Sequence, residues 1–307
     1  MRPLVALTVC LAIAACGSAQ SVARPIVLAP KPDCSNCWIT TNLKPDRDYK
    51  IVLGSKPRRC ALTVQGGHDI TVKGGAISIP WQHDVGHENI SKHYGIYLVD
   101  QTGEVRIEGV RLGGPDLIVP IVLNEGKGAK VTIRSVRAVL HSHWRNIRTA
   151  HGDCIQTWRG PKILDVDRFT CGTDYFFLQL QPLAYVCGSR MALQPPCDVF
   201  EADVPIRFSF RRINDFNSNP RRDSTRFAFW RENDGVLDPA TGRSADWPIS
   251  FRSVFAHVRK GRSCHEGTIV WPRAPRCSSW PAFKRGEPPS GDFVPATSDV
   301  GLRYGRR

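Results

Sequence analysis

The sequence predicts an all-β protein whose short strands stack as successive turns of a solenoid. Three observations lead to this prediction. Long amphipathic helical patterns are hard to find in the 307 residues. A short strand with apolar residues at relative positions 0, 2 and 5 recurs along the chain, and a second short apolar strand precedes most copies. Because one such turn cannot bury its own apolar face, stacking the turns is what creates a continuous core.

The recurring strand appears six times, at unequal spacings of 26 to 44 residues. The copies are ITVKGG (70–75), VRIEGV (105–110), VTIRSV (131–136), LDVDRF (164–169), FSFRRI (208–213) and ISFRSV (249–254). The preceding strands are GIYLVD (95–100), PIVLNE (120–125), CIQTWR (154–159), FLQLQP (177–182) and FAFWRE (227–232). A β-sandwich also uses many short strands, but the repeated register favours the solenoid.

This pattern resembles the right-handed parallel β-helix of the pectate-lyase-like superfamily, over roughly residues 50 to 275. The resemblance implies a parallel β-helix at 61–283, with inserted loops between its coils and an N-terminal cap at 20–60. The basic tail at 284–307 is rich in Pro, Gly and Arg, and we expect it to be an irregular cover or a mobile end. The resemblance concerns the fold and does not by itself fix an activity.

The first nineteen residues, MRPLVALTVCLAIAACGSA, predict a secretory signal, because one Arg precedes an apolar run that ends in small residues. Cleavage follows Ala19, or alternatively a lipobox, IAAC, leaves a lipidated Cys16. No second apolar run approaches the length of a membrane helix. We therefore expect an exported protein of the periplasm, envelope or exterior, a monomer, with membrane contact only through a lipid anchor.

Nine of the eleven cysteines lie beyond Cys10 and Cys16, and an oxidising compartment favours disulfides among them. The simplest pairs are local ones: Cys187–Cys197, Cys264–Cys277, and Cys60 with Cys34 or Cys37. An odd number leaves at least one thiol free or paired elsewhere. Zinc at Cys34 and Cys37 is not expected, since no second ligand pair completes the site.

The formal charge of +14 suits an acidic polysaccharide or another anionic partner, or it is simply a solvated positive surface. Nucleic acid is not expected, because no compact basic stripe or known binding module occurs. Stacking the copies aligns a row of alternating charge: Lys73, Glu108, Arg134, Asp167, Arg211 and Arg252. Asp167 is therefore interpreted as part of an ion-pair ladder rather than as a catalytic carboxylate.

The stretch HGDCIQTW (151–158) gathers the chemistry of a candidate site. β-Elimination on a uronate needs a cation for the carboxylate, a base for the C5 proton and an acid for the leaving oxygen. Arg145 or Arg148 would neutralise the carboxylate. His151 would be the base, oriented by Asp153, and Tyr175 would be the acid. The expected sugar-binding side chains, on one outer face, are Gln156, Trp158, Gln179, Tyr97 and Trp230.

Other interpretations stay open. The protein binds glycan without cleaving it, or serves the cell envelope as a structural solenoid. Alternatively, a transition metal is held by His141, His143, His151 and Asp153. Gln156 and Gln179 could instead form a buried amide ladder. No cofactor is expected; calcium is the alternative, because β-helix lyases often use it, but the sequence has no clear acidic cluster to hold it. A glycoside hydrolase is disfavoured, because a second unpaired carboxylate is not evident.

Overall fold

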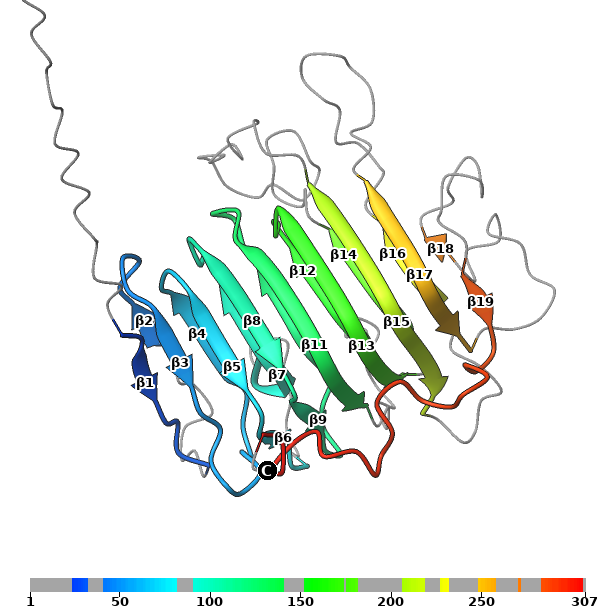
Figure 1. Cartoon of the computed structure of the whole chain (residues 1–307), viewed down its shortest axis with the longest axis horizontal. Helices are drawn as coiled ribbons and strands as arrows, with labels where there is room; N and C mark the ends of the chain where they lie inside the picture. Colours follow the sequence, from blue (N-terminus) through cyan, green and yellow to red (C-terminus); the bar gives the residue numbers. More distant parts are fainter. Residues whose placement is uncertain are drawn as a thin grey trace, which may run out of the picture.

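The fold consists of two β-sheets in which every strand pairing is parallel (Figure 1). The computed structural model describes residues 24–32, 41–81, 91–140, 152–173, 175–181, 206–218, 227–231, 248–257, 270–271 and 283–305. Within these ranges there is no α-helix, only a 3₁₀ turn at 91–93. The described residues therefore contain no helix that could span a membrane. The all-β prediction is confirmed.

One sheet has eleven strands and the other has eight. The larger sheet contains β1 (Ile26–Leu28), β3 (Tyr49–Ile51), β5 (Ile70–Lys73), β6 (Ala76–Ser78), β8 (Glu104–Glu108), β9 (Arg111–Gly113), β11 (Lys130–Val139), β13 (Ile163–Thr173), β15 (Arg207–Asn217), β17 (Ile249–Ala256) and β19 (Lys284–Arg285). The smaller sheet contains β2 (Thr41–Leu43), β4 (Leu62–Gly66), β7 (Tyr94–Val99), β10 (Val119–Asn124), β12 (Asp153–Trp158), β14 (Phe176–Gln181), β16 (Phe227–Arg231) and β18 (Val270–Trp271).

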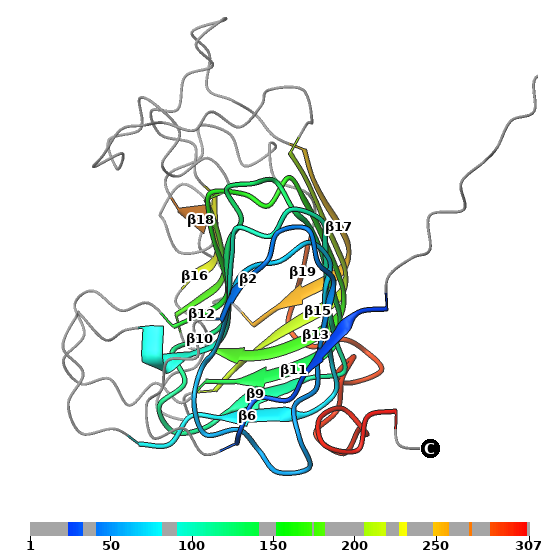
Figure 2. The ribbon, with the colours of Figure 1, turned by 90° about the vertical axis from the view of Figure 1, so that its left-hand side faces the viewer.

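From β10 onward the chain alternates strictly between the two sheets, so each consecutive pair of strands stacks in parallel on the pair before it. Figure 2 shows β10, β12 and β16 on one side of the interior and β11, β13 and β15 on the other. The described parts of 20–60 supply β1, β2 and β3 to the ends of these same sheets. This arrangement is compatible with the expected parallel β-helix.

The spacing 0, 2, 5 has a backbone cause. The residue at relative position 4 has a left-handed φ in all six copies: Gly74 (66°), Gly109 (70°), Ser135 (52°), Arg168 (56°), Arg212 (52°) and Ser253 (56°). Such a residue bends the strand and shifts the in-and-out alternation by one. Pairing continues in register on both sides of the bend, as in Arg134 with Asp167 and Val136 with Phe169. Position 5 therefore faces inward like positions 0 and 2.

The core lies between the two sheets and is made of these inward positions. Val131, Ile133 and Val136 of β11 are fully buried, and the next strand of the same sheet buries Leu164 and Phe169 above them. The preceding strands contribute a matching row from the smaller sheet: Leu62, Ile96, Ile121, Ile155 and Leu178. All of them belong to one continuous cluster, as the sequence pattern predicts.

The charged row also stacks in the expected register, from Lys73 to Arg252. Asp167 pairs with Arg211 at 3.8 Å and accepts two hydrogen bonds from Arg212. Burial alone would raise the pKa of Asp167, but the Arg212 hydrogen bond and the neighbouring guanidinium charges outweigh it, so this pKa is lowered. Asp167 is thus an ion-paired side chain, as predicted.

The C-terminal tail is an ordered cover over 286–305 that runs back across the ends of β15, β13 and β11 (Figure 1). Arg137 binds the Asp292 carboxylate and the Val294 carbonyl, both at 2.6 Å. Farther along, the Gly301 amide donates to the Gly109 carbonyl at 2.8 Å, and the Tyr304 hydroxyl donates to Glu108. The described residues of the tail thus lie as an irregular cover over these strand ends.

One disulfide, Cys154–Cys171, joins β12 to β13 across the interior, with a sequence separation of 17 residues. The prediction from the sequence did not include this pair. Cys60 is also disulfide-bonded. The predicted local pairs Cys187–Cys197 and Cys264–Cys277 lie outside the described residues, as do Cys34 and Cys37.

Replacing both Cys154 and Cys171 with Ala should lower the free energy of unfolding by about 3 kcal/mol, because the disulfide reduces the conformational entropy of the unfolded chain. Urea denaturation of the oxidised variant against the oxidised wild type measures this loss without reducing the other cysteines. A variant that unfolds at the same urea concentration as the wild type would contradict the expectation.

Candidate functional site

Asp153, the first residue of β12, is a buried carboxyl group at the start of a strand of the smaller sheet. The next two residues, Cys154 and Ile155, both belong to the core, so the in-and-out alternation begins only after this point of β12. Neither oxygen of Asp153 has a hydrogen-bond partner among the described residues. Burial raises the pKa of this carboxyl well above its usual value, which favours the protonated form.

Tyr175 is brought to the same end of β12. The Thr173 hydroxyl donates to the Gly152 carbonyl at 2.5 Å and accepts the backbone N–H of Tyr175 at 3.1 Å. Asp153 pairs in register with Phe176, the residue after Tyr175. The sequence-predicted residues Asp153 and Tyr175 therefore lie on neighbouring strand ends, with Thr173 linking the two backbone segments.

Four of the five predicted sugar-binding residues fall on one row along the outer face of the smaller sheet. Parallel pairing aligns Tyr97, Val122, Gln156, Gln179, Trp230 and Trp271. For Tyr97, Val122 and Gln179 the residues on either side belong to the core, and Gln156 lies between Ile155 of the core and the buried Thr157, so these four side chains face away from it. Sequence reasoning missed Val122, because an apolar residue in an apolar strand has no distinctive signal.

The two amides of this row are more buried than sequence reasoning predicted. Gln156 is 6% exposed and Gln179 is 2% exposed, although an open sugar-binding face was expected. The Gln179 side-chain amide donates to the Gln181 side-chain oxygen at 2.9 Å. Strand alternation shows that both face outward, but it cannot show whether an outer face is covered. The pairing of Gln156 with Gln179 suits the alternative of a buried amide ladder.

Trp158 belongs to a second outer row, next to Asn124 on one side and Gln181 on the other. It is partly buried and packs against a small apolar cluster that contains Tyr94, Val119 and Val122. Tyr97 also packs against this cluster, and its ring meets Tyr94 edge to face at 5.6 Å between centroids. Both predicted aromatic residues thus have a structural contact as well as an outer position.

A polar network that the sequence did not predict continues this second row. Arg159 donates to the Asn124 side-chain oxygen at 2.8 Å and lies 3.4 Å from the Asp100 carboxylate. The Asn124 amide in turn donates to the Tyr97 hydroxyl at 3.3 Å. The signal was present in the sequence, because Asp100 and Arg159 end two of the expected strands, but strand-end polar residues commonly serve turns.

Glu125, in the same region, is fully buried. Its Oε2 accepts the backbone N–H of Gln101 at 2.9 Å, and its Oε1 has no hydrogen-bond partner among the described residues. Burial raises the pKa of Glu125 to about 8, and the hydrogen bond from Gln101 only partly opposes this effect. The Gln101 side-chain amide itself donates to the carbonyls of Val64, Gly66 and Val99. Glu125 and Gln101 thus link the ends of neighbouring strands in the smaller sheet.

Asp48, His68 and Asp69 form a different group. A ring nitrogen of His68 and one carboxylate oxygen of each Asp, atom types that can bind a metal ion, lie within 4.8 Å of one another. His68 Nδ1 lies 3.0 Å from Asp48 and 3.4 Å from Asp69. The two carboxylates also accept backbone N–H groups, of Asp69 and of Glu104. These contacts show that the three side chains stabilise the turns near β3 and β5.

The remaining predicted site residues are not placed. His151, Arg145 and Arg148 lie outside the described residues, as do His141 and His143 of the alternative metal set. For Trp230 the structure gives the backbone position alone. The described part of the predicted catalytic set is thus Asp153 with Tyr175.

Comparison with known proteins adds no relative. No family model, curated protein or solved structure matches this chain.

Proposed function

We propose that this chain is an exported right-handed parallel β-helix protein of the pectate-lyase-like type. It binds an acidic polysaccharide on the outer side of the eight-stranded sheet and cleaves it by β-elimination. Two parallel sheets, which the chain visits in strict alternation from β10 onward, support this fold. A right-handed path is the proposal because parallel crossover connections are almost always right-handed. The segment 20–60 would cap the N-terminal end of the stack.

The observation that carries the proposed function is the buried Asp153 carboxyl at the start of β12, three residues before Gln156 and beside the strand end that holds Tyr175. A buried carboxyl that lacks a hydrogen-bond partner among the described residues is costly, and such groups concentrate at functional sites. Asp153 lies two residues after His151 in the sequence, and in this proposal its carboxyl orients the imidazole.

In this proposal the base is His151, and the proton it takes comes from C5 of the uronate. The C4–O bond breaks, a C4=C5 double bond forms, and Tyr175 gives its proton to the leaving oxygen. Arg145 or Arg148 neutralises the uronate carboxylate. Asp153 is a positioning residue: because burial disfavours its ionised form, the charge on Asp153 is stabilised mainly when His151 becomes an imidazolium.

A second candidate function is a glycan-binding or envelope β-helix without catalysis. The burial of Gln156 and Gln179 favours it, because an amide pair that is 6% and 2% exposed suits a structural ladder better than an open sugar contact.

The test is the ultraviolet absorbance of the new double bond, followed with the mature protein on a panel of acidic polysaccharides, with and without calcium. We expect Asp153→Asn to lower kcat roughly a hundredfold and to change the pH profile of kcat, with little change in KM. His151→Ala should abolish the signal. Asp165→Asn, which changes a partly exposed carboxylate on β13 in the other sheet, is the matched control and should keep full activity.

No absorbance on any polysaccharide, together with retarded migration in a gel that contains the glycan, would favour the binding protein. Full activity of Asp153→Asn at unchanged stability would show that the assigned site is wrong.

A further inference from the structure

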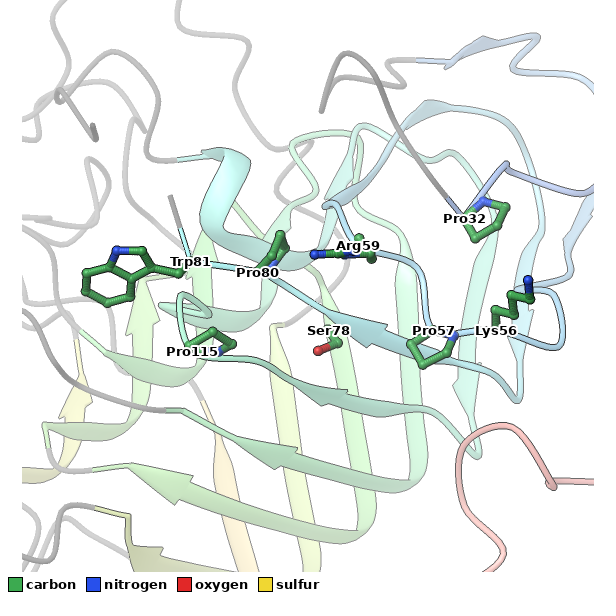
Figure 3. A pocket seen from close by; sticks show the side chains of 8 residues that line it. All are labelled: Pro32, Lys56, Pro57, Arg59, Ser78, Pro80, Trp81 and Pro115. Carbon is green, nitrogen blue, oxygen red and sulfur yellow. The ribbon is translucent and has the colours of Figure 1, made fainter. Parts of the chain in front are cut away.

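A groove of about 590 Å³ lies near the N-terminal end of the stack (Figure 3). Its lining includes Trp81 and Pro115 toward one end, Arg59 near the middle, and Pro57 and Lys56 toward the other end. The Trp81 side chain is 50% exposed, so half of its large apolar surface is accessible to solvent. A large aromatic surface beside cations is a common arrangement in sites that bind sugars or other ring compounds.

The walls of the groove are held by backbone hydrogen bonds from several strands. The Arg59 amide donates to the Pro32 carbonyl at 3.0 Å, and the Ser78 amide donates to the Arg58 carbonyl at 2.8 Å. Arg58 is 1% exposed, and its guanidinium binds the carbonyls of Lys31 and Ala61. A ligand would therefore meet a preformed surface, so that little conformational entropy is lost on binding.

The charges of the groove select an anionic ligand. Lys56 and Arg59 are both exposed, and the described residues that line the groove include no Asp or Glu. The groove is elongated, with Trp81 and Lys56 at opposite ends (Figure 3). An extended chain with repeated carboxylates and flat sugar rings matches this order better than a compact anion does, because one ring can lie on Trp81 while separate carboxylates reach Arg59 and Lys56.

The groove also lies on the side of the fold that holds Asp153. Trp81 follows β6, Pro115 follows β9, and Asp153 begins β12, so all three stand where the chain leaves the larger sheet toward the smaller one. β7, β10 and β12 are successive neighbours in the smaller sheet. Parallel strands are spaced about 4.8 Å apart, so the groove begins within roughly one or two strand spacings of Asp153 along the stack.

We propose that this groove is a distal subsite for the acidic polysaccharide, with a sugar ring stacked on Trp81 and uronate carboxylates bound by Arg59 and Lys56. This inference rests on the proposed function for the identity of the ligand class. It adds a place of binding that is separate from the reacting bond. It also gives the direction in which the polysaccharide extends, toward the N-terminal end of the stack.

The test measures binding without turnover. The full mature chain with Asp153→Asn is titrated by calorimetry with a hexasaccharide of galacturonic acid. In this background we expect Trp81→Ala to raise Kd about tenfold. The double variant Lys56→Gln/Arg59→Gln should raise Kd about tenfold and weaken its dependence on salt. The double variant Lys50→Gln/Arg207→Gln removes two exposed cations from β3 and β15, so it matches the charge change, and it should alter Kd less than twofold.

Because the three test residues are largely exposed, the melting temperatures of the variants should stay unchanged, and each binding result then reports on the groove. Equal Kd values for the groove variants and the matched control would overturn the inference, and so would the absence of any binding. Tighter binding of a proline-rich peptide than of the hexasaccharide would overturn it as well. Groove-dependent binding in a chain that shows no lyase signal would contradict the proposed activity alone.

Discussion

Glu125→Gln should make the protein more stable than the wild type at alkaline pH and should remove much of the pH dependence of stability. The folded chain keeps Glu125 protonated up to about pH 8, whereas the ordinary value is 4.5. Between these two pH values the folded state binds the extra proton, so the free energy of unfolding falls as pH rises. The contribution of Glu125 is fully present below about pH 4.5 and is lost as pH passes 8.

The full loss is on the order of 5 kcal/mol, because the pKa rises from 4.5 to about 8 and each pKa unit corresponds to about 1.4 kcal/mol. The nearby charges oppose one another, since Asp100 raises the pKa of Glu125 and Arg159 lowers it. A glutamine has almost the same shape as a protonated Glu125 and can still accept the hydrogen bond from the Gln101 amide.

Urea denaturation of both proteins from pH 5 to pH 9 measures the difference. The gap between Glu125→Gln and the wild type should grow steadily above pH 5. Glu104→Gln is the control, because Glu104 is partly exposed and the hydrogen bond from Arg106 lowers its pKa. That variant should show no gain at alkaline pH. A constant gap for Glu125→Gln across the range would mean that Glu125 is ionised in the folded protein at pH 5.

Phe169→Ala should lower the free energy of unfolding by about 4 kcal/mol. Phe169 is fully buried on β13, and its ring stacks with that of Phe177 on β14, in the opposite sheet, with 6.4 Å between centroids. Removing the ring leaves a cavity between two sheets that the hydrogen bonds of their strands hold in place, so the site cannot collapse fully.

Chemical denaturation at constant pH measures this loss, and Phe169→Leu is the matched control that keeps most of the volume. The control should cost less than about 1.5 kcal/mol. A loss below 1 kcal/mol for Phe169→Ala would show that the two sheets repack around the missing ring.

The periodic part of the fold could be predicted because burial acts directly on the sequence. Val105 and Ile107, for example, must be apolar to face the interior, and this requirement repeats in every stacked strand. The left-handed bend that turns position 5 inward could not be predicted in the same way, because several of the residues that adopt it have no sequence signal for it. Ser135, Arg168 and Arg212 adopt it without the glycine that usually marks this conformation.

Contacts between distant segments could not be predicted for a different reason. Cys154 and Cys171 do not bracket a short loop, and only the placement of β12 and β13 in opposite sheets that face each other brings them together. The tail is held largely through backbone atoms, as when Arg111 donates to the Val300 carbonyl, so its sequence needs no pattern. Short strands such as β6 and β9 have only three residues, too few for a periodic signal.

In the candidate site, too, one part could be predicted from the sequence and another part could not. The alignment of Tyr97, Gln156 and Gln179 follows from the register of strands that the sequence already predicts. The burial of Asp153 and Glu125 does not, because an acidic residue at a strand end is usually exposed, and its burial depends on which other segments cover it.

The C-terminal tail also changes how the whole stack should unfold. In an array of layers that contact only their neighbours, the end layers can fray one by one. Here the tail leaves β19 and binds residues far earlier in the chain. The Tyr304 hydroxyl meets Glu108, 196 positions earlier, and the Gly301 carbonyl accepts the Gly75 amide from a still more distant position. Fraying of the last strands therefore also removes contacts at β5 and β8. The tail makes the two regions cooperative, and because its contacts span such long stretches of sequence, they belong to the late steps of folding.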